Sequence, residues 1–145
     1  MKAYFDTAVL VAASVARHEH HSQSMVAFES VREKRIQGHV SGHGLSEAYA
    51  VLTRTPFNPA VYPSEAWNLL NADILPYFEI VTITPQMYRE TIRDCAEKGW
   101  IGDRIYDALH IRCAIESNCE RIYTFNVAHF QSIAPKNIGS LMVAP

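Results

Sequence analysis

Short apolar runs alternate along the chain with longer segments in which apolar residues recur every three or four positions. This alternation is typical of an α/β protein with a parallel sheet. The expected strands are residues 3–5, 39–41, 79–83, 121–124 and a small last one at 141–143. The expected helices are residues 20–36, 45–54, 64–75, 85–98 and 105–116.

Proline and glycine residues mark several of the expected helix boundaries. Pro63 and Pro85 suit the first positions of helices, because the missing N–H of proline needs no partner there. Gly38 and Gly99 follow two helical patterns and are expected to end them.

The composition is that of a folded globular protein. Hydrophobic residues make up 48% and charged residues 19% of the 145 positions, which disfavours intrinsic disorder. No repeat, low-complexity tract or linker is seen, so one domain over residues 1–145 is expected. The prediction is therefore an α/β fold, a single domain with a mainly parallel central sheet of about four to five strands flanked by helices.

Export and membrane insertion are not indicated. No apolar run reaches the ~18 residues that a spanning helix needs, and the acid within the apolar N-terminal stretch argues against a signal peptide. Cys95, Cys113 and Cys119 form no metal-ligand pattern, and their odd number leaves one outside any disulfide. Reduced thiols and a cytoplasmic location are expected. The net charge of −2 provides no general attraction to polyanions, so a nucleic-acid partner has to be argued from a local site.

Asp6 directly follows the first apolar strand, residues 3–5. In a parallel α/β sheet, ligands bind outside the carboxyl ends of the strands, so this acid is placed for chemistry. Asp is also a favoured N-cap, and residues 7–10 are suited to open a helix. The two roles are compatible, and the local pattern does not choose between them.

Glu47 is the only charged residue between positions 45 and 53, in a helix that is apolar on nearly every face. Such a helix is expected to be buried, and burying an unpaired carboxylate is costly. Glu47 is therefore expected to meet a cation or to lie at an opening. The alternative is a first-turn acid that complements the helix dipole.

Asp107 lies beside a predicted apolar stripe formed by Ile105, Ala108, Ile111 and Ile115. This places it at the margin of the buried face. Asp103, four residues earlier, is a competing candidate and fits a helix-start role better. Spacing alone does not decide which of the two acids is functional.

Asp6, Glu47 and Asp107 each lie near the start of a helix, so they are able to converge at one end of the sheet. Clustered carboxylates repel one another unless hard cations neutralise them, and oxygen-only sites suit Mg²⁺ or Mn²⁺. Such ions hold phosphate oxygens and activate water. Phosphodiester hydrolysis is the chemistry that this pattern favours.

Four blocks of the sequence together resemble the PIN domain family, in particular VapC-type toxins of prokaryotic toxin–antitoxin pairs. They are residues 4–10 (YFDTAVL), Glu47 on an early helix, residues 105–110 (IYDALH) and residues 124–130 (TFNVAHF). No single block is specific, but their order and separation over essentially the whole chain are similar to the family. The resemblance implies a PIN-like fold, Mg²⁺ or Mn²⁺ as cofactor, and hydrolysis of RNA by a metal-activated water.

The resemblance also implies roles for particular residues. Asp6, Glu47 and Asp107 match the three principal acids and would be the metal ligands. Asn126 falls on the fourth acidic position, where many members carry Asp, so it keeps a carbonyl oxygen but lacks the charge. Thr7 and Thr124 would be supporting hydroxyls.

An endoribonuclease of this kind is expected to act as the toxin of a toxin–antitoxin pair. The partners implied are an RNA substrate, a cognate antitoxin protein and a second copy of the chain in a homodimer, with no membrane. The target RNA, the antitoxin, the oligomeric state, the number of metal ions and any help from Asp103 are left open by the sequence.

Histidines form a second set of candidates. His18, His20 and His21 resemble a metal cluster but open a polar-faced helix, which favours solvated surface. His43, near the start of the Glu47 helix, and His110, one turn after Asp107, stay minor candidates for RNA contact or acid–base chemistry.

Other activities lack the residues they need. A haloacid-dehalogenase-like phosphatase needs a second Asp where Ala8 stands, and neither a dinucleotide-binding glycine motif nor a G-x-S-x-G elbow is present. One alternative of a different class survives: a catalytically weak PIN-like domain that binds RNA or protein without cutting. Asn126 is the residue that keeps this alternative open.

Overall fold

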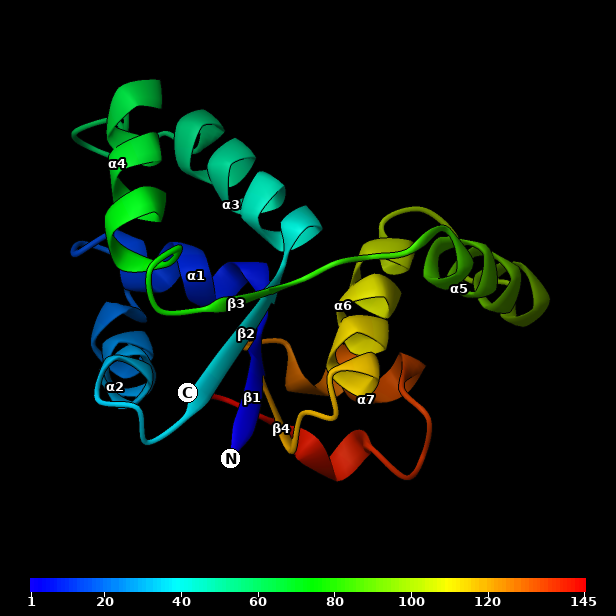
Figure 1. Cartoon of the computed structure of the whole chain (residues 1–145). Helices are drawn as coiled ribbons and strands as arrows, with labels where there is room; N and C mark the ends of the chain where they lie inside the picture. Colours follow the sequence, from blue (N-terminus) through cyan, green and yellow to red (C-terminus); the bar gives the residue numbers. More distant parts are fainter.

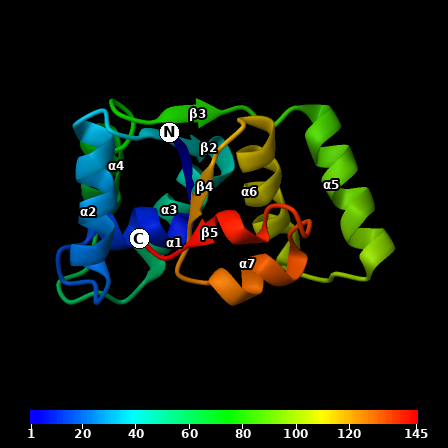
Figure 2. The same ribbon diagram turned by 90° about the horizontal axis from the view of Figure 1, so that it is seen from below.

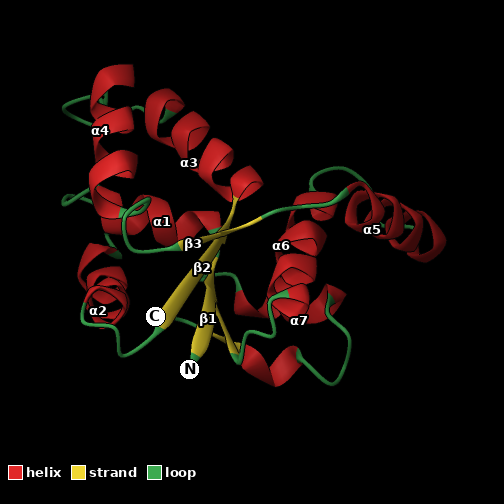
Figure 3. Ribbon diagram, viewed as in Figure 1, coloured by secondary structure: helices red, strands yellow, loops and turns green.

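Five parallel strands form the central sheet of the computed structural model, which describes residues 1–145 except for the side chain of Ser140. The strands are β1 (Lys2–Phe5), β2 (Gln37–Ser41), β3 (Glu79–Val81), β4 (Arg121–Tyr123) and β5 (Met142–Val143), in the spatial order β3-β2-β1-β4-β5. β1 is therefore the central strand, with β2 and β3 on one side of it and β4 and β5 on the other. Figure 3 shows the strands in yellow between the helices. Every strand pair is parallel, as the sequence predicts.

Helices cover both sides of the sheet. They are α1 (Thr7–Ser14), α2 (His21–Arg32), α3 (Gly42–Arg54), α4 (Pro63–Asp73), α5 (Pro85–Lys98), α6 (Arg104–Glu116) and α7 (Val127–Ile133), followed by a 3₁₀ turn at Gly139–Leu141. The first four helices lie on one side and the last three on the other, with α5 outermost (Figures 1 and 2).

Each side has its own hydrophobic core, because successive side chains of a strand point to opposite faces. Ala3 and Phe5 of β1 pack into the core beneath α1 to α4, while Tyr4 points into the core beneath α6 and α7. In β4, Tyr123 joins the first core and Ile122 joins the second. The central strand thus connects the two halves of the molecule.

The strand register brings the carboxyl ends of the central strands together. Phe5 pairs with Tyr123, and Tyr4 pairs with both His39 and Ile122. The residues that follow β1, β2 and β4 therefore emerge at one end of the sheet. The N-terminal ends of α3 and α6 lie at this same end (Figure 1).

Most predicted helix starts and ends agree with the structure within two or three residues. Pro63 and Pro85 are the first residues of α4 and α5. Gly99 ends α5 in the left-handed conformation, with φ of 69°. The predicted last strand is shorter than expected, and α7 had no sequence prediction, because a seven-residue helix carries little periodicity.

The prediction that the second helix runs to residue 36 is wrong. α2 ends at Arg32, and Lys34 has a positive φ of 59° in the turn that follows. Gly38 does not end a helix but lies within β2, where a Cβ would come within 2.6 Å of the Phe78 ring. Close packing of Phe78 on the strand is therefore the reason for this glycine.

No helix within the described residues is long and apolar enough to span a bilayer. Cys95, Cys113 and Cys119 are buried, and none of them forms a disulfide.

Candidate active site

Asp6 is held at the carboxyl end of β1 by the sheet itself. Its backbone N–H donates to the carbonyl of Tyr123 at 3.0 Å, which continues the β1–β4 pairing by one residue. The residue occupies the N-cap position of α1, but its side chain makes no capping hydrogen bond. Instead, its Oδ2 atom accepts a hydrogen bond from Thr124 Oγ1 at 2.9 Å. The buried carboxylate is thus aimed across the strand ends rather than at the helix.

The two predicted supporting threonines bond to acids. Thr124, fully buried after β4, also accepts a hydrogen bond from the backbone N–H of Asn126 at 3.1 Å. Thr7, the first residue of α1, donates from Oγ1 to Oε1 of Glu47 at 3.3 Å. Each hydroxyl therefore orients one carboxylate.

The expectation that the Glu47 helix is buried on nearly every side is wrong. Only one face of α3, which carries Gly44, Ala48 and Leu52, is buried, and Tyr49 is 40% exposed. Short side chains such as Ala50 and Thr53 make the sequence look apolar while they face solvent. Glu47 itself is at the edge of this face, with 31% of its side chain exposed. It lies at an opening and also meets histidines.

His110 is the centre of the site, although the sequence indicated it only as a minor candidate. Its Nε2 atom lies 2.9 Å from Glu47 Oε1, 3.2 Å from Thr7 Oγ1 and 3.7 Å from Asp6 Oδ1. Two of the predicted acids, from β1 and α3, therefore meet at one nitrogen atom. His110 itself is only 2% exposed.

The other side of the His110 ring is anchored in the core. Its Nδ1 atom lies 2.6 Å from the Tyr4 hydroxyl, which donates to Ser41 Oγ at 3.0 Å. Ser41 Oγ in turn accepts the N–H of Gly44 and caps α3. Because the Tyr4 hydroxyl donates to Ser41, Nδ1–H of the imidazole donates to Tyr4.

The buried face of α6 explains why His110 was undervalued. The predicted stripe included Ile115, which is 39% exposed, whereas Leu109, His110 and Cys113 are buried. The true buried face is displaced from the predicted stripe, toward His110.

Asp107 comes to the same site from α6. It lines one hollow with Asp6 and Thr7, and its Oδ2 atom lies 3.0 Å from His129 Nε2 of α7. Asp103 is exposed at the start of α6, makes no side-chain capping bond and does not line this hollow. The structure thus groups Asp107, and not Asp103, with Asp6.

Asn126 is exposed at the N-cap of α7 and lines the same hollow. The hollow has a volume of about 400 Å³. Its walls are formed by Asp6, Thr7, Ala8, Val11, His18, His20, Val51, Asp107, Phe125, Asn126 and Phe130. His18 and His20 are partly exposed, but they lie in the loop before α2 rather than on a helix face, and they line this hollow.

Burial and mutual repulsion govern the charges of the acids. Burial, with a smaller effect from the charge of Glu47, raises the pKa of Asp6. Burial and the charge of Asp6 also raise the pKa of Asp107. Burial alone would raise the pKa of Glu47, but the hydrogen bond and charge of His110 outweigh it and lower that pKa.

Nearby charges also outweigh burial in setting the pKa of His110. Burial alone would lower its pKa, but the hydrogen bond to Glu47 and the charges of Asp6, Glu47 and Asp107 outweigh it, so the pKa is raised. The three surrounding acids therefore favour the protonated form of the imidazole.

The donor set suits a hard divalent cation, since carboxylates from Asp6, Glu47 and Asp107 are joined by the amide oxygen of Asn126. Among the described residues, no three such side chains already surround one point. The reason is that Glu47 and Asp107 are turned toward histidines. His43 Nε2 and His129 Nε2 lie 3.0 Å from Glu47 and Asp107, at ion-pair distance, but neither makes a hydrogen bond of good geometry in the described part of the chain. These unsatisfied nitrogens beside the acids fit a site that is completed by a bound group.

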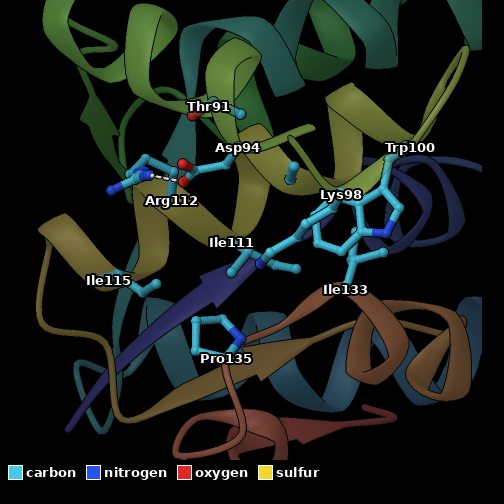
Figure 4. Close-up of a pocket in the computed structure, with 10 residues that line it drawn as sticks. Thr91, Asp94, Lys98, Trp100, Ile111, Arg112, Ile115, Ile133 and Pro135 are labelled. Atoms are coloured by element: carbon cyan, nitrogen blue, oxygen red, sulfur yellow. Dashed lines mark hydrogen bonds and ion pairs between the residues drawn. The ribbon is translucent and has the colours of Figure 1, made fainter. Parts of the chain in front are cut away.

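A second hollow, of about 230 Å³, lies between α5, α6 and α7 and contains none of the predicted site residues (Figure 4). Arg112 lies at one side of it and donates to Asp94 at 2.9 Å, while Lys98 Nζ lies 4.6 Å from the centre of the Trp100 ring. Its charged groups are therefore already paired with neighbours.

The chain matches the model of the PIN domain over residues 3–134. No curated protein sequence matches it significantly. Among solved structures it is similar to the Mycobacterium tuberculosis toxin VapC20, with a TM-score of 0.71, 13% identity, and coverage of 90% of this chain and 94% of that one. It is also similar to a structure of VapBC2 from Rickettsia felis, with a TM-score of 0.69, 19% identity, and coverage of 99% and 98%. The match over nearly the whole chain shows that this protein belongs to the PIN domain family.

Proposed function

We propose that the protein is a metal-dependent endoribonuclease that hydrolyses RNA phosphodiester bonds. The observation that carries the proposal is the meeting of Asp6 and Glu47 at the Nε2 atom of His110, with Asp107 lining the same hollow as Asp6. Holding one buried and two partly buried carboxylates, which repel one another, at the end of a sheet is costly. Such an arrangement is understandable where divalent cations and a phosphate group are to be bound.

Asp6, Glu47 and Asp107 would hold Mg²⁺ or Mn²⁺, with the carbonyl oxygen of Asn126 as a neutral fourth ligand. A bound divalent ion would supply Lewis-acid activation of a water and neutralise charge on the phosphate. The protein's own part is to fix the carboxylates. Thr124 orients Asp6, and Thr7 and His110 orient Glu47. No side chain needs to act as a nucleophile.

We further propose that the protein is the toxin of a toxin–antitoxin pair. Membership of the PIN domain family and the likeness to two structures from such systems support this role. The M. tuberculosis neighbour is described as a toxin that cleaves the sarcin–ricin loop, and the R. felis neighbour is a VapBC complex bound to promoter DNA. An antitoxin partner, homodimerisation and a cytoplasmic location are part of the same proposal.

The test is incubation of the purified protein with a mixed RNA pool and Mg²⁺ or Mn²⁺, beside the Asp6→Asn variant. Cleavage is expected for the natural protein and at least a hundred-fold less for the variant, by analogy with the loss of other central catalytic groups. Thr53→Ala, on the solvent side of α3, is a matched control for handling and folding. Cleavage that persists in excess chelator, or unchanged in Asp6→Asn, rules out the mechanism.

Asn126 supports a second candidate function. An amide at this position lowers the negative charge that would bind a second cation, which favours a PIN domain that binds RNA or a protein without cutting. RNA binding without cleavage by the natural protein, across both metals and a wide range of RNA sequences, would select this alternative.

A further inference from the structure

The hollow at the candidate site is lined by two chemically different groups of side chains. The first group is polar and comprises the acids Asp6 and Asp107 with Thr7 and Asn126. The second group is apolar or aromatic and comprises Ala8 and Val11 from α1, Val51 from α3, and Phe125 and Phe130 from the segment after β4. Metal ligation needs only the polar group, so the apolar and aromatic lining is not explained by the proposed chemistry.

The aromatic wall is organised by a contact between two distant loops. The His20 ring stacks on the Phe125 ring, with centroids 4.4 Å apart and planes inclined by 20°. His20 precedes α2, and Phe125 follows β4. His20 Nδ1 also lies 3.1 Å from Gln23 Oε1, which holds the ring in place. The hollow is therefore bordered by a preformed pair of stacked planar rings.

His18 adds a polar group to this wall. Its Nδ1 atom accepts the backbone N–H of His20 at 3.0 Å, so in the neutral ring the proton is on Nε2. Burial lowers the pKa of His18, which favours this neutral form. Nε2 makes no hydrogen bond to any described residue, so its N–H is available to a ligand in the hollow.

A planar heterocycle with carbonyl or ring-nitrogen acceptors suits all of these features. Bases stack on aromatic and imidazole planes, and an N–H donor reads the edge of a base. An isolated phosphate would be repelled by the acids, and the apolar side chains supply no positive charge to counter this repulsion. The volume of about 400 Å³ accommodates one nucleoside.

We infer that the aromatic part of the lining is a nucleobase subsite, in which one unpaired base next to the cleaved bond lies against the stacked His20–Phe125 pair and accepts a hydrogen bond from His18. The inference rests on the proposed nuclease function, because it places the adjoining phosphate at the acids. It identifies three residues that determine which RNA sequence is cut.

The first experiment measures binding without cleavage. Asp6→Asn protein with Mg²⁺ is titrated into a fluorescein-labelled single-stranded RNA and into an otherwise identical strand with abasic positions. Adding His20→Ala or Phe125→Ala is expected to weaken binding of the base-bearing strand about ten-fold or more and to leave the abasic strand unaffected. Trp67→Ala, which removes a 56% exposed aromatic ring from α4, is the matched control and should change neither.

Two results overturn the subsite. In the first, the two strands bind equally well to the Asp6→Asn protein. In the second, Phe125→Ala weakens both strands equally while circular dichroism shows an unchanged fold. Binding that discriminates the strands while the natural protein never cuts RNA keeps the subsite and rejects the nuclease. RNA cleavage by the natural protein that does not depend on the neighbouring base keeps the nuclease and rejects the subsite.

The second experiment tests His18 through the sequence preference of cleavage. His18→Ala is expected to change which base flanks the cut sites in a sequenced RNA pool, with most of the effect on KM. His18→Gln keeps an N–H donor on a longer amide and should recover part of the preference. A flanking-base distribution identical to that of the natural protein in both variants would contradict a reading role for His18.

Discussion

The Nε2 atom of His110 lies 2.9 Å from Oε1 of Glu47, although 63 positions separate the two residues in the chain. The contact places an imidazole, whose pKa the surrounding carboxylates raise, between acids that otherwise repel one another. It also connects the acid cluster to the core, because Nδ1 of the same ring is bonded to Tyr4. His110 thus orients Glu47 and anchors the acid cluster to the core.

Replacing His110 by Ala should reduce both stability and metal affinity. The buried Tyr4 hydroxyl loses a partner and a cavity opens, which costs about 2 to 4 kcal/mol. Loss of a group that orients a metal ligand weakens metal binding about 10- to 100-fold. Chemical denaturation and calorimetric titration with Mn²⁺ measure the two effects.

His21→Ala, in a part-buried histidine outside the hollow, provides the comparison. A His110→Ala protein that binds Mn²⁺ as tightly as the His21→Ala protein would show that His110 is only part of the core.

Asp107→Asn should abolish cleavage and stabilise the fold at neutral pH. The folded-state pKa of Asp107 is raised, so the ionised side chain costs free energy once the pH exceeds its unfolded value of about 4. A neutral amide of the same shape avoids this cost, and gains of about 1 kcal/mol are common for such changes. The gain should be full above the folded-state pKa and vanish as the pH falls below the unfolded value.

Thermal unfolding followed across this pH range measures the effect. The exposed Asp103→Asn, four residues away, is the matched control and should show no comparable gain. A loss of stability at neutral pH for Asp107→Asn would contradict the assigned sign.

Gly44→Ala should disturb the site through packing. A Cβ at Gly44 would lie 3.2 Å from both His110 Cε1 and Ser41 Oγ, and hydrogen bonds hold both neighbours in place. Overpacking of this kind typically costs about 1 to 3 kcal/mol.

Gly42→Ala is the control in the same helix, since nothing lies within 4 Å of a Cβ there. That substitution should be neutral or stabilising by up to about 1 kcal/mol, because Ala favours a helix. Equal unfolding free energies for the two variants would show that the His110 pocket can expand.

Asn126→Asp should strengthen metal binding. The side chain is exposed and lines the hollow with Asp6 and Asp107, so a carboxylate adds charge where a cation would bind. An increase in Mn²⁺ affinity of about five-fold or more is expected from one added charge at this range. Titration calorimetry with Asn126→Ser as the uncharged comparison measures it, and an unchanged affinity in Asn126→Asp would place Asn126 outside the metal site.

Local patterns along the chain were sufficient to predict the alternation of strands and helices and to propose Asp6, Glu47 and Asp107 as candidates. Local periodicity and turn residues carry this information, because they report contacts within a few positions. The same local signals misled where tertiary packing prevailed. Gly38 lies in β2 and makes room for the Phe78 ring instead of ending a helix. The buried face of α6 is displaced toward His110.

Which polar groups lie together at the candidate site depends on tertiary packing. The register of β1 with β2 and β4 brings Asp6 beside Thr124 and places α3 and α6 on either side of it. The pairing of Glu47 with His110, and the entry of His18 and His20 into the hollow, join residues far apart in the chain. Such contacts depend on how the elements pack around the sheet, and no pattern within a single element records them.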